Sequence, residues 1–261
     1  MENDKDFFKN FMNIKFKMAE KKCKKHGPVK VEVGIYSDGT EMDWICPLCL
    51  EENEIKESEK LKAEEKKRQI EGYQEANIEQ EYWDKTFDDY NAVTETQKKA
   101  LDSVKEMVSN HSGKVILLGT NGVGKTMLGS CAVKELGGKI LSMYEISTMI
   151  RQSYTTHSEK TELEIVKELA SMPFLVIDEL GRTKGSDAEL NWLSYVLDKR
   201  HVRNLPFMLL SNTHLISRCS KKGCPMCFEN YINNDILSRL RQNSKLINVE
   251  GPDYRSGKYF L

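Results

Sequence analysis

The chain has 261 residues, 30% of them charged and 39% apolar, which suits one medium-sized α/β domain with a smaller appendage. Its formal net charge of −1 at pH 7 excludes a globally basic coat for nucleic acid, although it allows a local basic face. No apolar run approaches the roughly 18 residues of a membrane span and residues 1–20 lack a continuous signal-peptide core, so we expect a cytoplasmic protein without a membrane partner.

The N-terminal cysteines are spaced like the ligands of a zinc ion. Cys23 and His26 form a C-x-x-H pair, and Cys46 and Cys49 form a C-x-x-C pair after nineteen intervening residues. Clustered cysteines in a reducing compartment favour metal over disulfide, and two such pairs match a tetrahedral Cys₃His site. This spacing argues against coincidence, so the sequence predicts a structural zinc ion in an N-terminal module of residues 1–50.

The spacer between the two pairs predicts a β-hairpin. Residues 29–45 alternate apolar and polar side chains, and Asp38-Gly39 supplies a turn. So small a module can hardly bury enough surface to fold without metal. Its lysines leave three roles open: contact with a partner protein, contact with a phosphate backbone, or a solvated basic face.

Residues 51–86 predict a charged helical linker. They are rich in Glu and Lys, contain no proline and offer many i,i+4 ion pairs but few apolar residues. A partly disordered charged linker is the alternative.

From residue 87 onward, short apolar runs alternate with segments of helical periodicity. This alternation predicts a parallel sheet of five strands covered by helices on both faces, in a domain of residues 87–261. The seventh cysteine, Cys131, lies in one of the predicted helices. The expected strands are 115–118, 140–143, 174–177, 207–210 and 246–249, and the expected helices include 127–136, 162–170 and 187–199.

The run GTNGVGKT, directly after the first apolar strand and before a helix, predicts a phosphate-binding loop. Its glycines let backbone N–H groups approach phosphate oxygens, and the following helix N-terminus adds a positive field. Lys125 would reach the β- and γ-phosphates of ATP, and the Thr126 hydroxyl would ligate Mg²⁺. A plain strand-to-helix turn would not need Lys-Thr at these positions. The predicted nucleotide-binding residues of the loop are Gly119, Thr120, Asn121, Gly122, Val123, Gly124, Lys125 and Thr126.

Two adjacent acids end the strand FLVIDEL. Asp178 would hold Mg²⁺ and Glu179 would orient and polarise the attacking water. Two such acids often only begin a solvated loop, but after a complete phosphate loop a catalytic role is favoured. A further strand ends in Ser211-Asn212, where the Asn212 amide could contact the γ-phosphate or water, although Ser-Asn is also ordinary turn chemistry.

Arginines near the C-terminus could stabilise charge on a transferring phosphate. Arg239 and Arg241 lie in NDILSRLRQ and Arg255 lies in GPDYRSGK, while a surface ion pair is the alternative for each.

Taken in order, GTNGVGKT, FLVIDELG, LLSN, ILSRLR and GPDYR resemble the AAA+ ATPases of the DnaC/DnaI helicase-loader group over residues 87–261. The resemblance implies an AAA+ fold, a replicative hexameric helicase and single-stranded DNA as partners, and an ATP-dependent homo-oligomer. It also implies that Asn212 is the sensor asparagine, that Arg239 is an arginine finger acting on a neighbouring subunit, with Arg241 as the alternative, and that Arg255 has a sensor-2-like role.

The sequence departs from that group between Asn212 and Ile236, where three further cysteines lie. Cys224 and Cys227 have the spacing of half a zinc site, and His214 and Cys219 are near enough to complete it. Two readings stay open, a second zinc ion and a segment with reduced, free thiols.

The leading functional hypothesis is an ATPase that delivers a replicative helicase to single-stranded DNA when replication begins. One alternative is an IstB-like transposition helper with the same core. Another is a nucleic-acid-binding zinc adaptor whose nucleotide is only structural, against which the pair Asp178–Glu179 counts.

Overall fold

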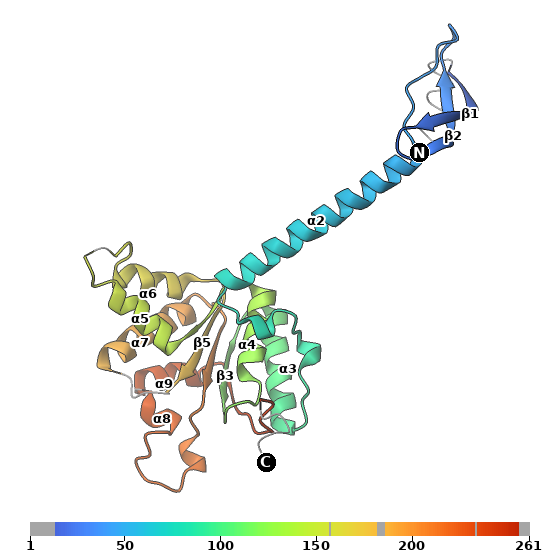
Figure 1. The fold of residues 1–261 in the computed structure, drawn as a ribbon. Helices are drawn as coiled ribbons and strands as arrows, with labels where there is room; N and C mark the ends of the chain where they lie inside the picture. Colours follow the sequence, from blue (N-terminus) through green and yellow to red (C-terminus); the bar gives the residue numbers. More distant parts are fainter. Residues whose placement is uncertain (1–13, 157, 182–185, 233, 256–261) are drawn as a thin grey trace. The chain divides into compact units, whose positions relative to one another are not determined.

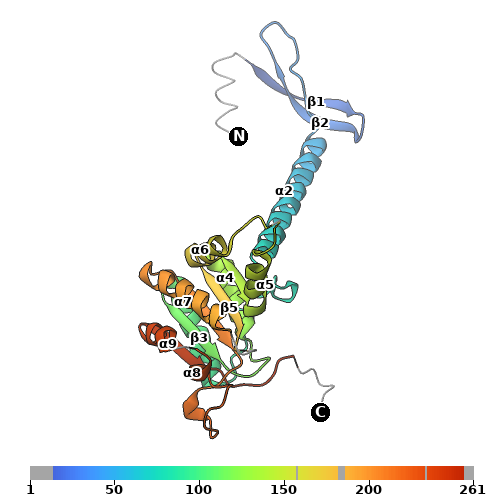
Figure 2. The ribbon, with the colours of Figure 1, turned by 90° about the vertical axis from the view of Figure 1, so that its left-hand side faces the viewer.

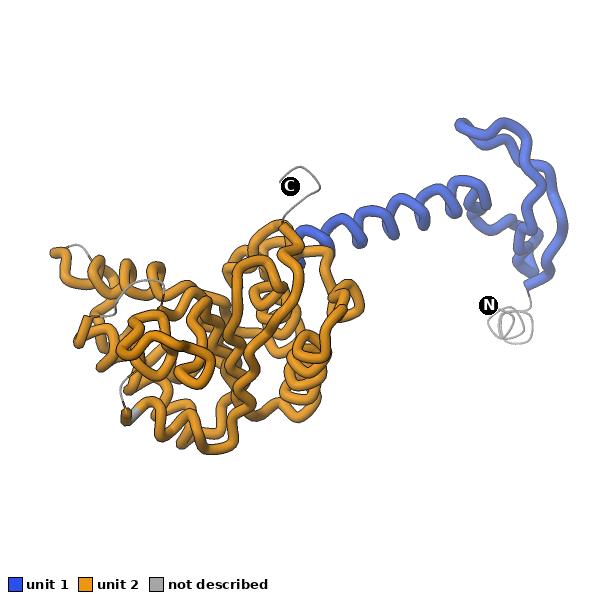
Figure 3. Tube along the Cα trace, turned by 90° about the horizontal axis from the view of Figure 1, so that it is seen from below, with its two compact units in different colours: residues 1–69 blue, residues 70–261 orange. Residues whose placement is uncertain are grey.

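The computed structural model describes residues 14–156, 158–181, 186–232 and 234–255. Contacts divide the chain into two compact units, residues 1–69 and 70–261 (Figure 3). The border falls inside helix α2 (Pro47–Glu75), which begins within the predicted zinc module and has no buried residue. The helix ends at Glu75, before the predicted linker end at residue 86. The boundaries at residues 50 and 86 stay predictions.

The first unit contains an antiparallel pair of strands, β1 (Lys15–Cys23) and β2 (Gly27–Ile35). This antiparallel pair confirms the predicted small β-hairpin module, but its turn lies at residues 24–26, because β2 pairs with the preceding lysine-rich segment rather than with a strand after Asp38-Gly39. Lysines on the exposed face of β1 hide its alternation. A turn does form at Asp38-Gly39, but beyond it a single bridge joins Ile35 to Glu41.

The second unit is built on a sheet with the strand order β4-β5-β6-β3-β7, in which every neighbouring pair is parallel. This confirms the predicted five-stranded parallel sheet. Strands β3 and β6 are buried along their whole length, as expected for a sheet covered on both faces. The strands are β3 (Lys114–Leu118), β4 (Lys139–Ser142), β5 (Leu175–Leu180), β6 (Phe207–Ser211) and β7 (Ser244–Asn248).

Helices cover both faces of this sheet (Figures 1 and 2). Along β3, Ile116 and Leu118 join one hydrophobic cluster, whereas Val115 and Leu117 join the other. Helices α5 (Met143–Gln152), α6 (Glu162–Ser171), α7 (Asp187–Val202), α8 (Phe228–Tyr231) and α9 (Asn234–Arg241) contribute to the first cluster, and α3 (Glu95–Asn110) and α4 (Lys125–Leu136) to the second.

Local sequence fixes where several helices begin. Helices α3, α5, α6 and α7 each start after a Ser or Thr whose side chain accepts a hydrogen bond from the N3 backbone N–H, and the Glu or Gln side chain at N3 accepts one from the backbone N–H of the cap.

The short elements are the 3₁₀ turns η1 (Gln80–Tyr82), η2 (Phe87–Asp89) and η3 (Ile216–Arg218). Over the described ranges, no helix combines the length and apolarity that crossing a bilayer needs.

The strand order determines where polar side chains meet. Strand β6 lies between β3 and β5, so residues that follow these three parallel strands gather at one edge of the sheet. The phosphate loop, the acidic pair and Asn212 all follow or end these strands.

Candidate nucleotide site and metal centres

The predicted phosphate loop spans the gap between the end of β3 at Leu118 and the start of α4 at Lys125. Gly119, Gly122 and Gly124 have φ angles of 143°, 76° and 90°, which only glycine adopts without strain. A Cβ on Gly119 would lie 2.2 Å from the Val249 carbonyl oxygen. The loop therefore packs directly against the segment that follows β7.

Lys125 lies at the centre of this arrangement. Its ammonium donates to the carbonyl oxygens of Gly119 at 2.9 Å and Thr120 at 2.7 Å, and to Oδ1 of Asn212 at 2.9 Å. Only 7% of the residue is exposed. Burial lowers the pKa of the Lys125 ammonium to about 8. A buried cation at a helix N-terminus is suited to an anionic ligand.

Thr126 and Asp178 bring two hard oxygen donors together. The Thr126 hydroxyl donates to Oδ2 of Asp178 at 2.8 Å. Hydroxyl and carboxylate oxygens are the ligands that Mg²⁺ prefers, and the ion usually takes only one or two from protein. These two residues therefore fit the predicted magnesium position.

Glu179 has an unusual backbone for a residue other than glycine, with a φ of 56°. The register of β5 against β6 shifts between Ile177 and Leu180, and the Glu179 N–H donates to Oδ1 of Asp178 at 2.6 Å. Such conformations cluster at functional sites. Glu179 lines the same cavity as Lys125.

This cavity has a volume of about 1170 Å³, large enough for a nucleotide. Among the predicted residues, Gly119, Thr120 and Val123 belong to the loop but not to the cavity wall. Those that line it are Asn121, Gly122, Gly124, Lys125, Thr126, Asp178, Glu179, Asn212 and Arg255.

Residues before the predicted domain also line the cavity, and the sequence analysis missed them. Glu79 and Tyr82 are among them, although residues 51–86 are assigned to a linker by the sequence, and Tyr90, just inside the predicted domain, also lines the cavity. The Tyr90 hydroxyl donates to the Val123 carbonyl at 3.0 Å, and a Cβ on Gly124 would lie 2.5 Å from the Tyr90 ring. The aromatic residues in 73–90 were the available signal.

Two of the three predicted arginines, Arg255 and Arg239, are placed differently. Arg255 lines the cavity and donates to the Tyr82 hydroxyl at 3.5 Å, a contact that raises its pKa. Arg239, on α9, lies outside the cavity wall, and its Nε lies 2.9 Å from Oδ1 of Asp198 on α7.

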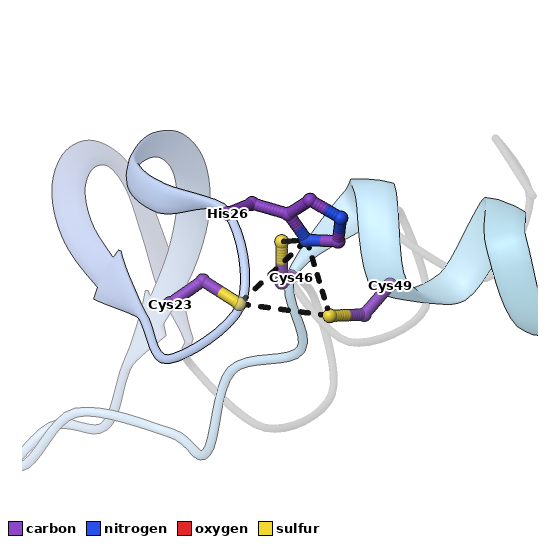
Figure 4. Close-up of side chains that lie close together, drawn as sticks. All are labelled: Cys23, His26, Cys46 and Cys49. Carbon is purple, nitrogen blue, oxygen red and sulfur yellow. Dashed lines mark hydrogen bonds between the residues drawn. The ribbon is translucent and has the colours of Figure 1, made fainter.

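The four residues of the first metal cluster converge (Figure 4). Nδ1 of His26 lies 3.8, 3.6 and 3.3 Å from the sulfurs of Cys23, Cys46 and Cys49. These separations suit four ligands around one zinc ion. Backbone N–H groups, that of His26 first, lower the pKa of the Cys23 thiol to about 6.

Glu52 completes this cluster, and the sequence analysis missed it. Its carboxylate lies 3.1 Å from Nε2 of His26, so Nδ1 is left facing the sulfurs, and the contact raises the pKa of His26 to about 9. A carboxylate behind a histidine is the usual outer partner of a zinc ligand. The spacing Cys49-x-x-Glu52 was the only signal for it.

The second cluster also converges, because the ligand atoms of His214, Cys219, Cys224 and Cys227 all lie within 4.8 Å of one another. The contact with His214 lowers the pKa of the Cys219 thiol to about 7, while burial raises that of Cys227 to about 12.

A phosphate loop beside an acidic pair and a polar residue from the strand between them, on this sheet order, defines an AAA+ P-loop ATPase. A family comparison narrows the class, since the family described as "IstB-like ATP binding protein" matches residues 52–259. The chain belongs to this family.

Relatives and solved structures agree with this assignment. The chain is 24% identical over 177 residues to "Replicative helicase loader DnaC" of Escherichia coli strain K12, covering 65% of this chain and 72% of that protein. It is also 24% identical over 189 residues to the same-named protein of Buchnera aphidicola subsp. Acyrthosiphon pisum, covering 69% and 73%.

Among solved structures, a "DnaC helicase loader" has a TM-score of 0.53 at 20% identity and covers 66% of this chain and 100% of that one. A structure of "DnaI" has a TM-score of 0.52 at 20% identity, covering 68% and 94%. At these identities the two structures establish the fold.

Proposed function

We propose that this protein is an ATP-dependent helicase loader that delivers a replicative hexameric helicase to single-stranded DNA at the start of replication. One observation carries the proposal. A cavity lined by the phosphate loop, Asp178, Glu179 and Arg255 lies in a chain whose curated relatives are named replicative helicase loaders.

The cavity residues divide the work of ATP hydrolysis. Lys125 binds the β- and γ-phosphates, and its removal from water strengthens that attraction. Thr126 and Asp178 would hold Mg²⁺, which when bound neutralises phosphate charge. Glu179 accepts the proton of the attacking water, and Asn212 holds Lys125 and the water in place.

Nucleotide state then controls partner contact. If the ATP-bound and ADP-bound forms differ in affinity for helicase and DNA, turnover shifts the population between holding and releasing them. Arg239 would complete the site of a neighbouring subunit in an ATP-dependent homo-oligomer.

The residues around the first zinc site form the partner-binding module in this proposal. Cys23, His26, Cys46 and Cys49 would hold Zn²⁺, and the metal would fix the turn between β1 and β2 and the start of α2. Exposed lysines of β1 remain available for helicase or DNA.

Hydrolysis is tested with Glu179→Gln in the full chain. The variant should bind ATP as the wild type does while turnover falls by about 10²–10⁴, the usual contribution of a general base. Glu59→Gln, on the exposed part of α2, is the matched control and should leave turnover unchanged. Normal turnover by Glu179→Gln would remove Glu179 from the mechanism.

Loading is tested by adding the full chain, the host replicative helicase and circular single-stranded DNA, with ATP. The expected result is helicase bound to DNA with wild-type protein and little with Lys125→Ala. If the helicase neither binds the chain nor moves to DNA, while a transposase is stimulated instead, the transposition helper replaces the loader.

A further inference from the structure

The segment between β6 and α9 folds around the second cluster rather than around apolar side chains alone. His214 and Cys227 form a bridge of parallel type. The His214 N–H donates to the Met226 carbonyl at 3.0 Å, and the Phe228 N–H donates to the His214 carbonyl at 2.8 Å. These backbone bonds bring residues twelve and fourteen positions apart into fixed contact.

The four side chains of this cluster have the chemistry and spacing of a zinc site. Nε2 of His214 lies 3.8 Å from the Cys224 sulfur, and all four ligand atoms lie within 4.8 Å of one another. A tetrahedral ion with zinc–sulfur bonds of about 2.3 Å and zinc–nitrogen bonds of about 2.0 Å places its ligands about 3.5–3.8 Å apart, so a small contraction suffices.

The turn that carries the thiols has the same sequence pattern as the first cluster. Cys224-Pro-Met-Cys227 repeats the Cys-Pro-x-Cys pattern of residues 46–49. Gly223, with a φ of 70°, supplies the bend before Cys224, and the Cys227 N–H donates to the Cys224 carbonyl at 3.2 Å. A disulfide could join only two of the three cysteines, so it would leave one thiol and His214 of the cluster unexplained.

The cluster lies in the chain between Asn212 and Arg239, two residues of the proposed ATPase mechanism. On one side, His214 follows Asn212 by two residues, and between them Thr213 is buried with its hydroxyl 2.8 Å from that of Ser211. On the other side, Cys227 is the N-cap of α8, from which Phe228 enters the core cluster shared with α9.

We propose that His214, Cys219, Cys224 and Cys227 bind a second structural zinc ion, which braces the segment between Asn212 and Arg239. The metal-binding part of the proposal rests on the geometry of the four ligand atoms alone. The bracing role rests on the proposed function of these two residues, so the two parts are tested separately.

The metal is tested by counting zinc in purified full-length protein by mass spectrometry. Wild type should carry two ions per chain, Cys224→Ser/Cys227→Ser one, and Cys46→Ser/Cys49→Ser one. Cys131→Ser, a buried cysteine outside both clusters, should keep two. A single ion in the wild type that persists in Cys224→Ser/Cys227→Ser overturns the site.

A second measurement covers the case in which the double variant does not fold. Cobalt titrated into metal-free wild type should produce tetrahedral thiolate absorption that saturates at two equivalents. Saturation at one equivalent overturns the proposal. An intact mass 2 Da below that of the reduced chain also overturns it, because that difference is the signature of a disulfide.

The bracing role has a readout that does not depend on ATP. Lys221 and Lys222 are exposed in this segment, so trypsin should cut there at least tenfold faster in Cys224→Ser/Cys227→Ser than in wild type. In the same variant, ATP affinity should stay within about twofold while turnover falls at least tenfold. Equal trypsin rates overturn the brace, and absence of turnover in the wild type itself refutes the proposed ATPase without touching the zinc count.

Discussion

The Lys125 ammonium donates a hydrogen bond to Oδ1 of Asn212 at 2.9 Å and so joins the first residue of α4 to the residue after β6. Adjacent parallel strands make this contact possible, since Leu118 of β3 pairs with Ser211 of β6. The contact also keeps the buried cation close to two carbonyl oxygens. Phosphate groups beside it would restore the ordinary pKa of a lysine.

Nucleotide binding should therefore take up a proton. The pKa of Lys125 in the protein alone is about 8, so at pH 8.5 the ammonium is mostly deprotonated, and binding should draw about 0.7 proton from solution. Because the bound form has the higher pKa, ATP affinity is greatest below pH 8 and falls as the pH rises above it. Calorimetry in buffers of different ionisation enthalpy measures the uptake.

Lys125→Arg is the matched control, because an arginine keeps its proton throughout this range. The variant should bind ATP without proton uptake. An uptake at pH 8.5 equal to that of the wild type would assign the titration to another group.

The phosphate loop packs closely against the segment after β7, so adding one methyl group to Gly119 should destabilise the fold. Gly119→Ala would put its Cβ 2.2 Å from the Val249 oxygen at a φ of 143°, so we expect a loss of about 1–3 kcal/mol in the free energy of unfolding. Gly72→Ala, in open space on α2, should instead gain about 0.5–1 kcal/mol. Urea unfolding midpoints measure both, and a Gly119→Ala protein as stable as the wild type would contradict the packing.

Much of the ATPase unit was predictable because its signals are local. The buried strand before GTNGVGKT, the acids that end β5 and the apolar run of β6 each follow from a few consecutive residues. Parallel strands then bring their carboxyl ends together, so the convergence of Lys125, Asp178 and Asn212 follows from topology.

What the sequence did not predict depends on contacts between distant residues. Tyr90 packs on a glycine thirty-four positions later, and no local pattern marks that contact. The pairing of β1 with β2 was missed because exposed lysines on β1 carry no apolar alternation. Glu52 was missed because it acts through His26, twenty-six positions earlier in the chain.

Glu52→Ala should weaken zinc binding at the first cluster by about 10–100-fold, the usual cost of losing the partner of a ligating histidine. The carboxylate fixes the ring with Nδ1 facing the sulfurs, and without it the ring can rotate. Competition with a chromophoric chelator measures the affinity. Glu51→Ala, on the exposed side of the same helix turn, should bind zinc as the wild type does. Equal affinities in both variants would leave Glu52 with no part in the site.

Arg239→Ala should lower ATP turnover by about 10³-fold, the lower end of the range for an arginine finger, while ATP affinity stays close to that of the wild type. The guanidinium lies outside the cavity of its own chain, so its loss should not disturb nucleotide contacts. Asp198→Ala is the decisive control, because it removes the ion pair and keeps the arginine. An ion pair whose side chains are 37% and 35% exposed contributes about 0–1 kcal/mol, so Asp198→Ala should have nearly normal stability and ATP turnover. If both variants lose turnover alike, Arg239 is structural.

Mixing two inactive variants tests whether Arg239 acts on a neighbouring subunit. Glu179→Gln keeps the arginine and lacks the base, whereas Arg239→Ala keeps the base and lacks the arginine. In a randomly mixed oligomer, about a quarter of the interfaces join an intact phosphate-loop site to an intact Arg239, so about a quarter of wild-type turnover should return. Arg241→Ala, two positions along the same helix, should be active by itself. Because an arginine acting within its own chain cannot be supplied by a neighbour, a mixture no more active than its components would place Arg239 outside the catalytic interface.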